Sequence, residues 1–194
     1  MLARTIISVI AILIAIAGNY IYFKDVFSSK TKPHIFTWLI WAAIDFIACA
    51  AQFASGAGIA AFVIGANALC AFVIFVLAYR QGEKDLKPLD FLSLLFAMLA
   101  LIFLVVVKEP LISILLVIAI SLLGFIPTVR KSFTKPHEET LIYYVLMGLR
   151  ASLTLLALEK YVPATFLEPA SMAVANFCFV VLLTIRRRQI ISTY

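Results

Sequence analysis

The sequence predicts an all-α integral membrane protein with seven transmembrane helices. Of its 194 residues, 64% are hydrophobic and only 13% are charged. The mean hydropathy of +1.11 is far above that of a soluble domain. The charged residues gather in short clusters between long apolar runs, a pattern typical of helices that cross a bilayer.

Seven apolar runs are long enough to cross a membrane. A hydrocarbon core about 30 Å thick requires roughly 20 helical residues, and such runs are bounded by charged or Gly/Pro clusters. The connections between the runs are short, so the sequence leaves no room for a separate soluble domain. The runs cover approximately residues 5–23, 35–54, 59–79, 89–107, 111–129, 140–158 and 164–185.

The basic residues predict the orientation of these spans, because Lys and Arg are enriched in cytoplasmic loops. Twelve of the 16 basic residues fall on one face, three on the other, and Arg150 lies within a span. We therefore predict an external N-terminus and a cytoplasmic C-terminus, with a bacterial inner membrane as the location. The twelve are Lys24, Lys30, Lys32, Arg80, Lys84, Lys87, Arg130, Lys131, Lys135 and Arg186, Arg187, Arg188.

Composition and motifs argue against several classes of function. The net charge of +6 is explained by topology and indicates no nucleic-acid partner. Cys49, Cys70 and Cys178 are too few, and lie in apolar stretches, for a disulfide framework. The chain has no H-E-x-x-H, G-x-S-x-G or phosphate-binding motif and no Cys/His cluster. We expect no enzyme activity, no cofactor and no metal.

Two segments of the chain repeat each other. GNYIYFKDVFSSKTKPHIFTWLIW resembles GFIPTVRKSFTKPHEETLIYYVL after a difference in loop length, and Ala-Asn recurs in the third and seventh spans. We predict two parallel three-helix repeats, 1–81 and 110–194, joined by a connector helix within 82–109. The matched positions are Gly18 with Gly124, Lys24 with Arg130, Phe27 with Phe133, Pro33 with Pro136 and Asn67 with Asn176.

These features resemble the SWEET and SemiSWEET sugar transporters of the PQ-loop superfamily. The similarity rests on the 3+1+3 arrangement, the segment GFIPTVRKSFTKP, and an Asn in each third helix. The resemblance implies that Asn67 and Asn176 face a central pocket and that prolines act as hinges. Pro127 matches such a hinge in the second repeat, whereas the first repeat has Ile21 at that position.

Four polar residues are predicted to lie near the middle of the membrane. Asp45, Asn67, Arg150 and Asn176 are each 10 to 13 residues from a cytoplasmic anchor, which places them roughly 15 to 20 Å deep. Polar groups at this depth are costly, so each should face a cavity or a partner. Their shared depth is the main indication of a functional site.

The residues of this site allow more than one interpretation. Asn67 and Asn176 offer donors and acceptors to a hydroxyl-rich or amide-bearing solute, or they bond neighbouring backbone and hold helices together. Trp41 lies on the same helix face as Asp45 and would stack on a sugar ring, or donate its indole N–H within the bundle.

Asp45 and Arg150 leave three hypotheses open. They pair across the repeats as a gate or binding site; Arg150 binds an anionic substrate while Asp45 couples transport to protons; or they form a static ion pair. Pro127 should kink its helix near Gly124, either as a hinge for rocking or as a static bend.

The function expected from these features is transport of a small polar solute by alternating access, with sugar as the first guess from the resemblance. The alternatives are a PQ-loop receptor or sorting adaptor that binds a ligand without transport, and a proton-coupled amino-acid or vitamin transporter that uses Asp45. The expected partners are the solute and the lipid bilayer, and a homo-oligomer stays open.

Overall fold

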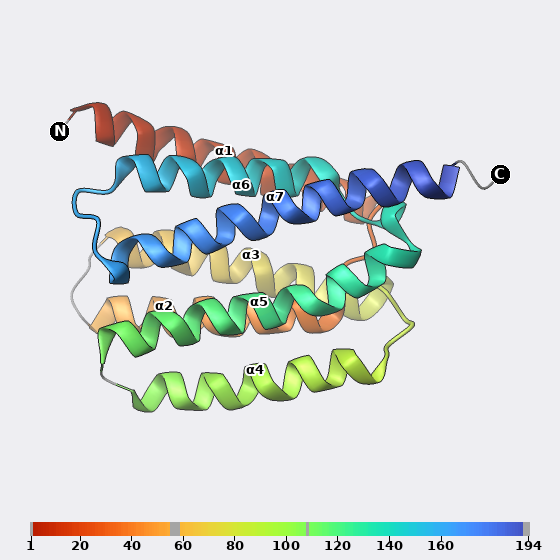
Figure 1. Cartoon of the computed structure of the whole chain (residues 1–194), viewed down its shortest axis with the longest axis horizontal. Coiled ribbons are helices and arrows are strands. Elements are labelled where there is room, and N and C mark those ends of the chain that lie inside the picture. Colours follow the sequence, from red (N-terminus) through yellow and green to blue (C-terminus); the bar gives the residue numbers. More distant parts are fainter. Residues whose placement is uncertain (1, 55–58, 108, 192–194) are drawn as a thin grey trace. The chain divides into compact units, whose positions relative to one another are not determined.

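A computed structural model describes residues 2–54, 59–107 and 109–191 and folds them almost entirely into helices (Figure 1). The described ranges contain no strand, so the predicted all-α class is confirmed. Each predicted span holds one α-helix, and a short 3-10 helix, η1 (Pro136–Glu138), precedes the sixth. The α-helices are α1 (Leu2–Phe27), α2 (Ile35–Ala54), α3 (Ile59–Gln81), α4 (Pro88–Val106), α5 (Pro110–Thr134), α6 (Leu141–Ala157) and α7 (Pro163–Ile191).

Five of the described helices are long and apolar enough to cross a membrane, as expected of an integral membrane protein. They are α1, α4, α5, α7 and the Ile64–Gln81 part of α3. The apolar helices α2 and α6 are shorter, and the 17 residues of α6 are near the lower limit for a span. Crossing by α2 and α6 therefore stays a prediction.

Three helices extend farthest beyond the predicted apolar runs. α1, α5 and α7 have 26, 25 and 29 residues, and α7 continues through the arginines at 186–188. Adding a residue to an existing helix gains a backbone hydrogen bond, and Arg is a strong helix former. The helix ends therefore lie past the apolar boundaries that hydropathy detects.

The helices form two compact units, and these units are not the two sequence repeats. Unit 1 comprises Met1–Thr31, Glu109–Ile118 and Ser132–Tyr194, and unit 2 comprises Lys32–Lys108 and Ala119–Lys131. Within unit 1, α6 contacts both α1 and α7; within unit 2, α2 contacts α3 and α4 (Figure 1). The first helix of the 1–81 segment thus groups with α6 and α7, while much of α5 groups with α2 and α3.

Among the close helix contacts at glycines, one in each unit occupies a matching position. In unit 2, a Cβ added at Gly124 of α5 would meet Ile40 and Trp41 of α2. In unit 1, a Cβ added at Gly18 of α1 would meet Leu146 and Met147 of α6. The same number of residues separates Gly18 from Gly124, Ile40 from Leu146 and Trp41 from Met147. The α1–α6 and α5–α2 contacts therefore have the same register.

One further pair of contacts has the same offset. Thr37 of α2 and Thr128 of α5 form a buried hydroxyl hydrogen bond of 2.9 Å in unit 2. Tyr22 of α1 and Tyr143 of α6 occupy the equivalent positions in unit 1, with ring centroids 4.7 Å apart. The two helix pairs therefore share a backbone arrangement but differ in the chemistry between their helices.

Candidate functional site

Asp45 and Asn67 form a direct polar pair in unit 2. Asn67 Nδ2 of α3 donates to Asp45 Oδ2 of α2 over 2.6 Å. Asp45 lies about 15 Å along α2 from its first residue, Ile35, and is partly buried, while Asn67 is exposed. The structure thus brings together two of the predicted site residues near the middle of two apolar helices.

Trp41 lies one helical turn before Asp45, where α2 contacts α5. Its Nε1 donates to the carbonyl of Ser121 over 3.2 Å. Its ring lies edge-on to Phe125, with centroids 4.9 Å apart, and faces the backbone of Gly124. The indole N–H therefore has a partner within the unit. This agrees with the interpretation that Trp41 donates its indole N–H within the helix bundle.

Gly124 and Pro127, the predicted hinge residues, lie within an unbroken helix. α5 runs from Pro110 to Thr134 with Pro127 in its interior. Since Pro127 has no N–H, the carbonyl four residues earlier lacks its helical donor. Gly124 is where the Trp41 ring reaches the α5 backbone. The role of Gly124 visible in the structure is close packing, and hinge motion stays a prediction.

Asn176 makes a different contact from Asn67. Its Nδ2 donates to the carbonyl of Met172 over 2.7 Å, one turn earlier in α7, and its side chain is 6% exposed. By the register of the helix contacts, the position equivalent to Asp45 is Ala151, which offers no carboxylate. The two matched Asn residues are therefore chemically unequal.

Arg150 of α6 belongs to unit 1, and its side chain donates no hydrogen bond within the described part of the chain. Its buried Nε has no partner there. The charge shown to interact with it is that of Glu168 in α7, which attracts it electrostatically. Asp45 belongs to unit 2, so the predicted Asp45–Arg150 pair stays a prediction.

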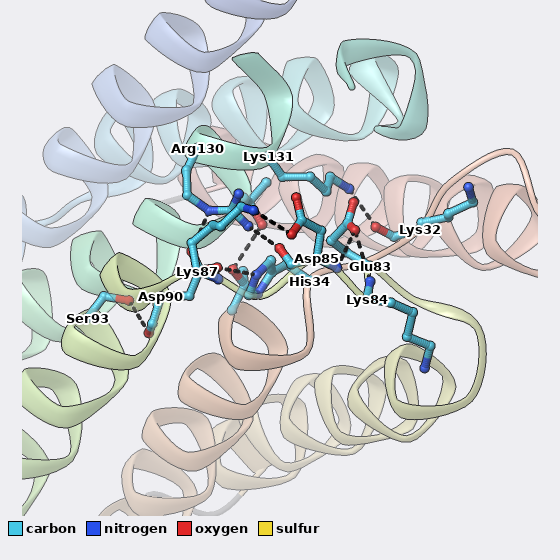
Figure 2. Close-up of polar contacts among 12 residues, drawn as sticks. Lys32, His34, Glu83, Lys84, Asp85, Lys87, Asp90, Ser93, Arg130 and Lys131 are labelled. Carbon is cyan, nitrogen blue, oxygen red and sulfur yellow. Dashed lines mark hydrogen bonds and ion pairs between the residues drawn. The ribbon is translucent and has the colours of Figure 1, made fainter. Parts of the chain in front are cut away.

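A buried charged cluster in unit 2 was not predicted as a site (Figure 2). At its centre is Asp90, in the first turn of α4 and 0% exposed. Its Oδ1 accepts from Arg130 Nε over 2.7 Å, and its Oδ2 accepts from the Lys87 backbone N–H over 2.8 Å. Arg130 also donates to the Asp85 carbonyl over 2.9 Å. These bonds tie the beginning of α4 to the end of α5.

His34 completes this charged cluster. Its Nε2 lies 3.3 Å from Asp90 Oδ2 but is not aligned for a hydrogen bond, and the ring is fully buried. Burial lowers the pKa of His34 to about 4, although the negative charge of Asp90 favours the protonated form. His34 is therefore neutral at pH 7.

The sequence contained one signal for the cluster. Acidic and basic residues alternate in the segment EKDLKPLD, immediately before and within the start of α4. As cytoplasmic charges, these residues predict topology. The pairing of Asp90 with Arg130, some 40 residues away, depends on tertiary structure.

The corresponding end of unit 1 combines hydroxyl groups with the buried carboxylate of Glu139, which attracts Arg187. Thr140 Oγ1 donates to Asp25 Oδ2 over 2.9 Å and shares a hydrogen bond with Thr31. Arg187 of α7 donates to the carbonyls of Pro136 and Glu139. An open pocket of about 390 Å³ lies among these residues, with Lys30 and His137 also in its lining.

No group of His, Cys, Asp and Glu side chains in the described ranges is arranged to hold a metal ion. The polar groups present suit hydrogen bonding and charge pairing. Comparison with protein-family models, curated proteins and solved structures found no match for this chain.

Proposed function

We propose that the protein transports a small polar solute across a membrane by alternating access, and that Asp45 and Asn67 contact the solute. The observation that carries this proposal is the 2.6 Å hydrogen bond between these side chains, midway along two apolar helices, with Asn67 exposed. An exposed amide at this depth is costly in lipid, which favours a polar occupant or an aqueous path.

The pair has the chemistry to bind a hydroxylated solute. Asp45 is an acceptor when ionised, and Asn67 retains a second amide proton and its carbonyl oxygen for a ligand. A solute hydroxyl can donate to one group and accept from the other. Sugar is the first candidate, by resemblance to the SWEET family, and a protonatable Asp45 would also permit coupling to a proton gradient.

The proposed architecture is two equivalent three-helix repeats with α4 as connector. The common register of the Gly18 and Gly124 contacts supports equivalence of α1 with α5 and of α2 with α6. Internal repeats of this kind are a recognised basis for alternating access. Pro127 would supply local flexibility in α5.

The test is solute counterflow in proteoliposomes, with labelled sugars, amino acids and vitamins supplied one at a time. We expect uptake of at least one compound by the wild type and its loss in Asn67→Ala and Asp45→Ala. Ser113→Ala is the control, because this hydroxyl bonds only the nearby Glu109 carbonyl in the described structure.

Two results would contradict the transport proposal. Uptake that is unchanged in both site variants would exclude Asp45 and Asn67 as solute contacts. A compound that stabilises the purified protein yet never accumulates in proteoliposomes would favour the receptor or sorting-adaptor function.

A further inference from the structure

A second polar site lies in unit 1, at Arg150 and Glu168. The Arg150 guanidinium carries five N–H donors and remains charged at all physiological pH values. Its Nε is buried without a partner, and no side-chain hydrogen bond from Arg150 occurs in the described part of the chain. Arg150 as a whole is partly exposed, but a buried N–H without an acceptor lowers stability. An acceptor from outside the described chain would stabilise Arg150.

Glu168 lies beside Arg150 but is not bonded to it. The two residues are on contacting helices, α6 and α7. Arg150 is about 10 Å from the end of α6, and Glu168 is about 8 Å from the start of α7, so they lie at similar depth. Arg150 attracts the Glu168 carboxylate electrostatically, yet no ion pair joins them in the described structure.

A proline next to Glu168 adds another acceptor. Pro169 lies inside α7, and its missing N–H leaves the carbonyl of Thr165 without its usual helical donor. A carbonyl freed by a proline in a membrane helix accepts from neighbouring donors. This part of α7 thus presents a carboxylate and a carbonyl, and the facing part of α6 presents a guanidinium.

We infer that Arg150 and Glu168 bind the two charged ends of one zwitterion, a free α-amino acid. The ligand carboxylate would accept from the N–H groups of the Arg150 guanidinium, and the ligand ammonium would donate to Glu168 and the Thr165 carbonyl. A ligand with opposite charges on adjacent groups satisfies both side chains at once, whereas a plain anion would leave Glu168 without a partner. This site lies in unit 1 and does not depend on transport through Asp45 and Asn67.

The test is thermal stabilisation of the purified full-length protein in detergent by each neutral amino acid. Every amino acid that stabilises the protein is then compared with its decarboxylated amine and its deaminated acid, for example L-leucine with isopentylamine and 4-methylpentanoate. We expect stabilisation by the amino acid and little or none by either fragment, because each fragment leaves one charged side chain without its partner.

Two variants assign the site. Arg150→Gln and Glu168→Gln should each lower amino-acid affinity about 10- to 150-fold, the effect of losing one charged hydrogen-bonding partner. Glu159→Gln and Arg188→Gln make the same chemical changes at exposed positions and should leave the affinity unchanged. If a site variant fails to fold, the comparison of amino acid with fragments on the wild type still decides.

Three outcomes would overturn the inference. They are the absence of stabilisation by any amino acid, equal stabilisation by the deaminated acid, and undiminished affinity in both folded site variants. Equal binding of the acid would indicate a simple anion site. Because binding is measured without a membrane gradient, amino-acid binding in the absence of flux would reject transport while retaining this site.

Discussion

The two matched helix pairs, α2 with α5 and α6 with α1, share a register but are stabilised by different chemistry. Unit 2 joins its helices through the Thr37–Thr128 hydrogen bond and the Trp41 indole on the Ser121 carbonyl. Unit 1 places the rings of Tyr22 and Tyr143 against each other at the positions equivalent to the two threonines. The repeated backbone contact therefore does not require repeated side chains.

The same contrast appears at the charged ends and in the third helices. Unit 2 buries Asp90 against Arg130, whereas unit 1 bonds Asp25 to Thr140. Asn67 meets a carboxylate on a neighbouring helix, whereas Asn176 bonds its own helix. The matched positions of the two units therefore carry different polar contacts.

The largest difference should appear at the charged ends. Asp90→Ala would leave Arg130 without its carboxylate and lower the free energy of unfolding by about 3–5 kcal/mol. Asp25→Ala in unit 1 removes a bond to a neutral hydroxyl and should cost about 1 kcal/mol. Denaturant titration in detergent measures both values, and Asp85→Ala, at a residue 51% exposed, is the control. Equal losses for Asp90 and Asp25 would contradict this contrast.

The next largest effect concerns pH. The pKa of His34 is lowered to about 4 from 6.5, so the unfolded chain binds a proton that the folded chain does not. Its contribution to stability is complete above pH 6.5 and is lost as the pH falls towards 4. The loss should reach about 3 kcal/mol. His34→Gln should flatten this part of the stability profile, and His137→Gln, at the exposed histidine of the matched motif, should preserve it.

Alanine at Gly124 or Gly18 should give a smaller difference in stability between the two units. At Gly124, a Cβ would lie 2.7 Å from Nε1 of the rigid Trp41 indole, and we expect a net loss of about 1–3 kcal/mol. At Gly18, it would lie 2.6 Å from Cε of Met147. This flexible side chain can move aside, so the higher helix propensity of Ala should limit the change to about 1 kcal/mol or less. Thermal melts would show a larger shift for Gly18→Ala if this reasoning is wrong.

The smallest effect is the coupling between Thr37 and Thr128. A double-mutant cycle with Thr37→Val and Thr128→Val should give about 0.5–1.5 kcal/mol, the net worth of one hydrogen bond. The same cycle on Ser113 and Thr37, which share no hydrogen bond, should give a value near zero. A coupling near zero for the threonine pair would mean that their contact adds little to the shared register.

Hydropathy was sufficient to predict the helices of this fold but not their partners. The seven apolar runs each contain a helix, because helix formation depends on local sequence and on the length of apolar segments. The grouping of α1 with α6 depends on contacts between distant residues such as Gly18 and Met147, which no local pattern encodes. The Lys-Pro-His match also misaligns the second helices, since η1 inserts residues after Pro136.

Single polar residues were easier to find than their bonds. Counting residues from the cytoplasmic anchors identified Asp45 and Asn67, and the structure places them in contact. It identified Arg150 but not Glu168, whose charge acts on Arg150 in the structure. It did not identify Asp90, because a single carboxyl near a helix start gives no sign of the arginine that it will bind.

If Asp45 and Asn67 contact the transported solute, water and solute reach Asn67 but not the buried Asn176. The most direct measurement is labelling by a membrane-impermeant methanethiosulfonate reagent in proteoliposomes. Asn67→Cys and Asn176→Cys are each made in a background with Cys49, Cys70 and Cys178 replaced by Ala. We predict rapid modification at position 67, slowed by the transported solute, and little modification at position 176. Equal modification at both positions, or none at 67, would contradict the account.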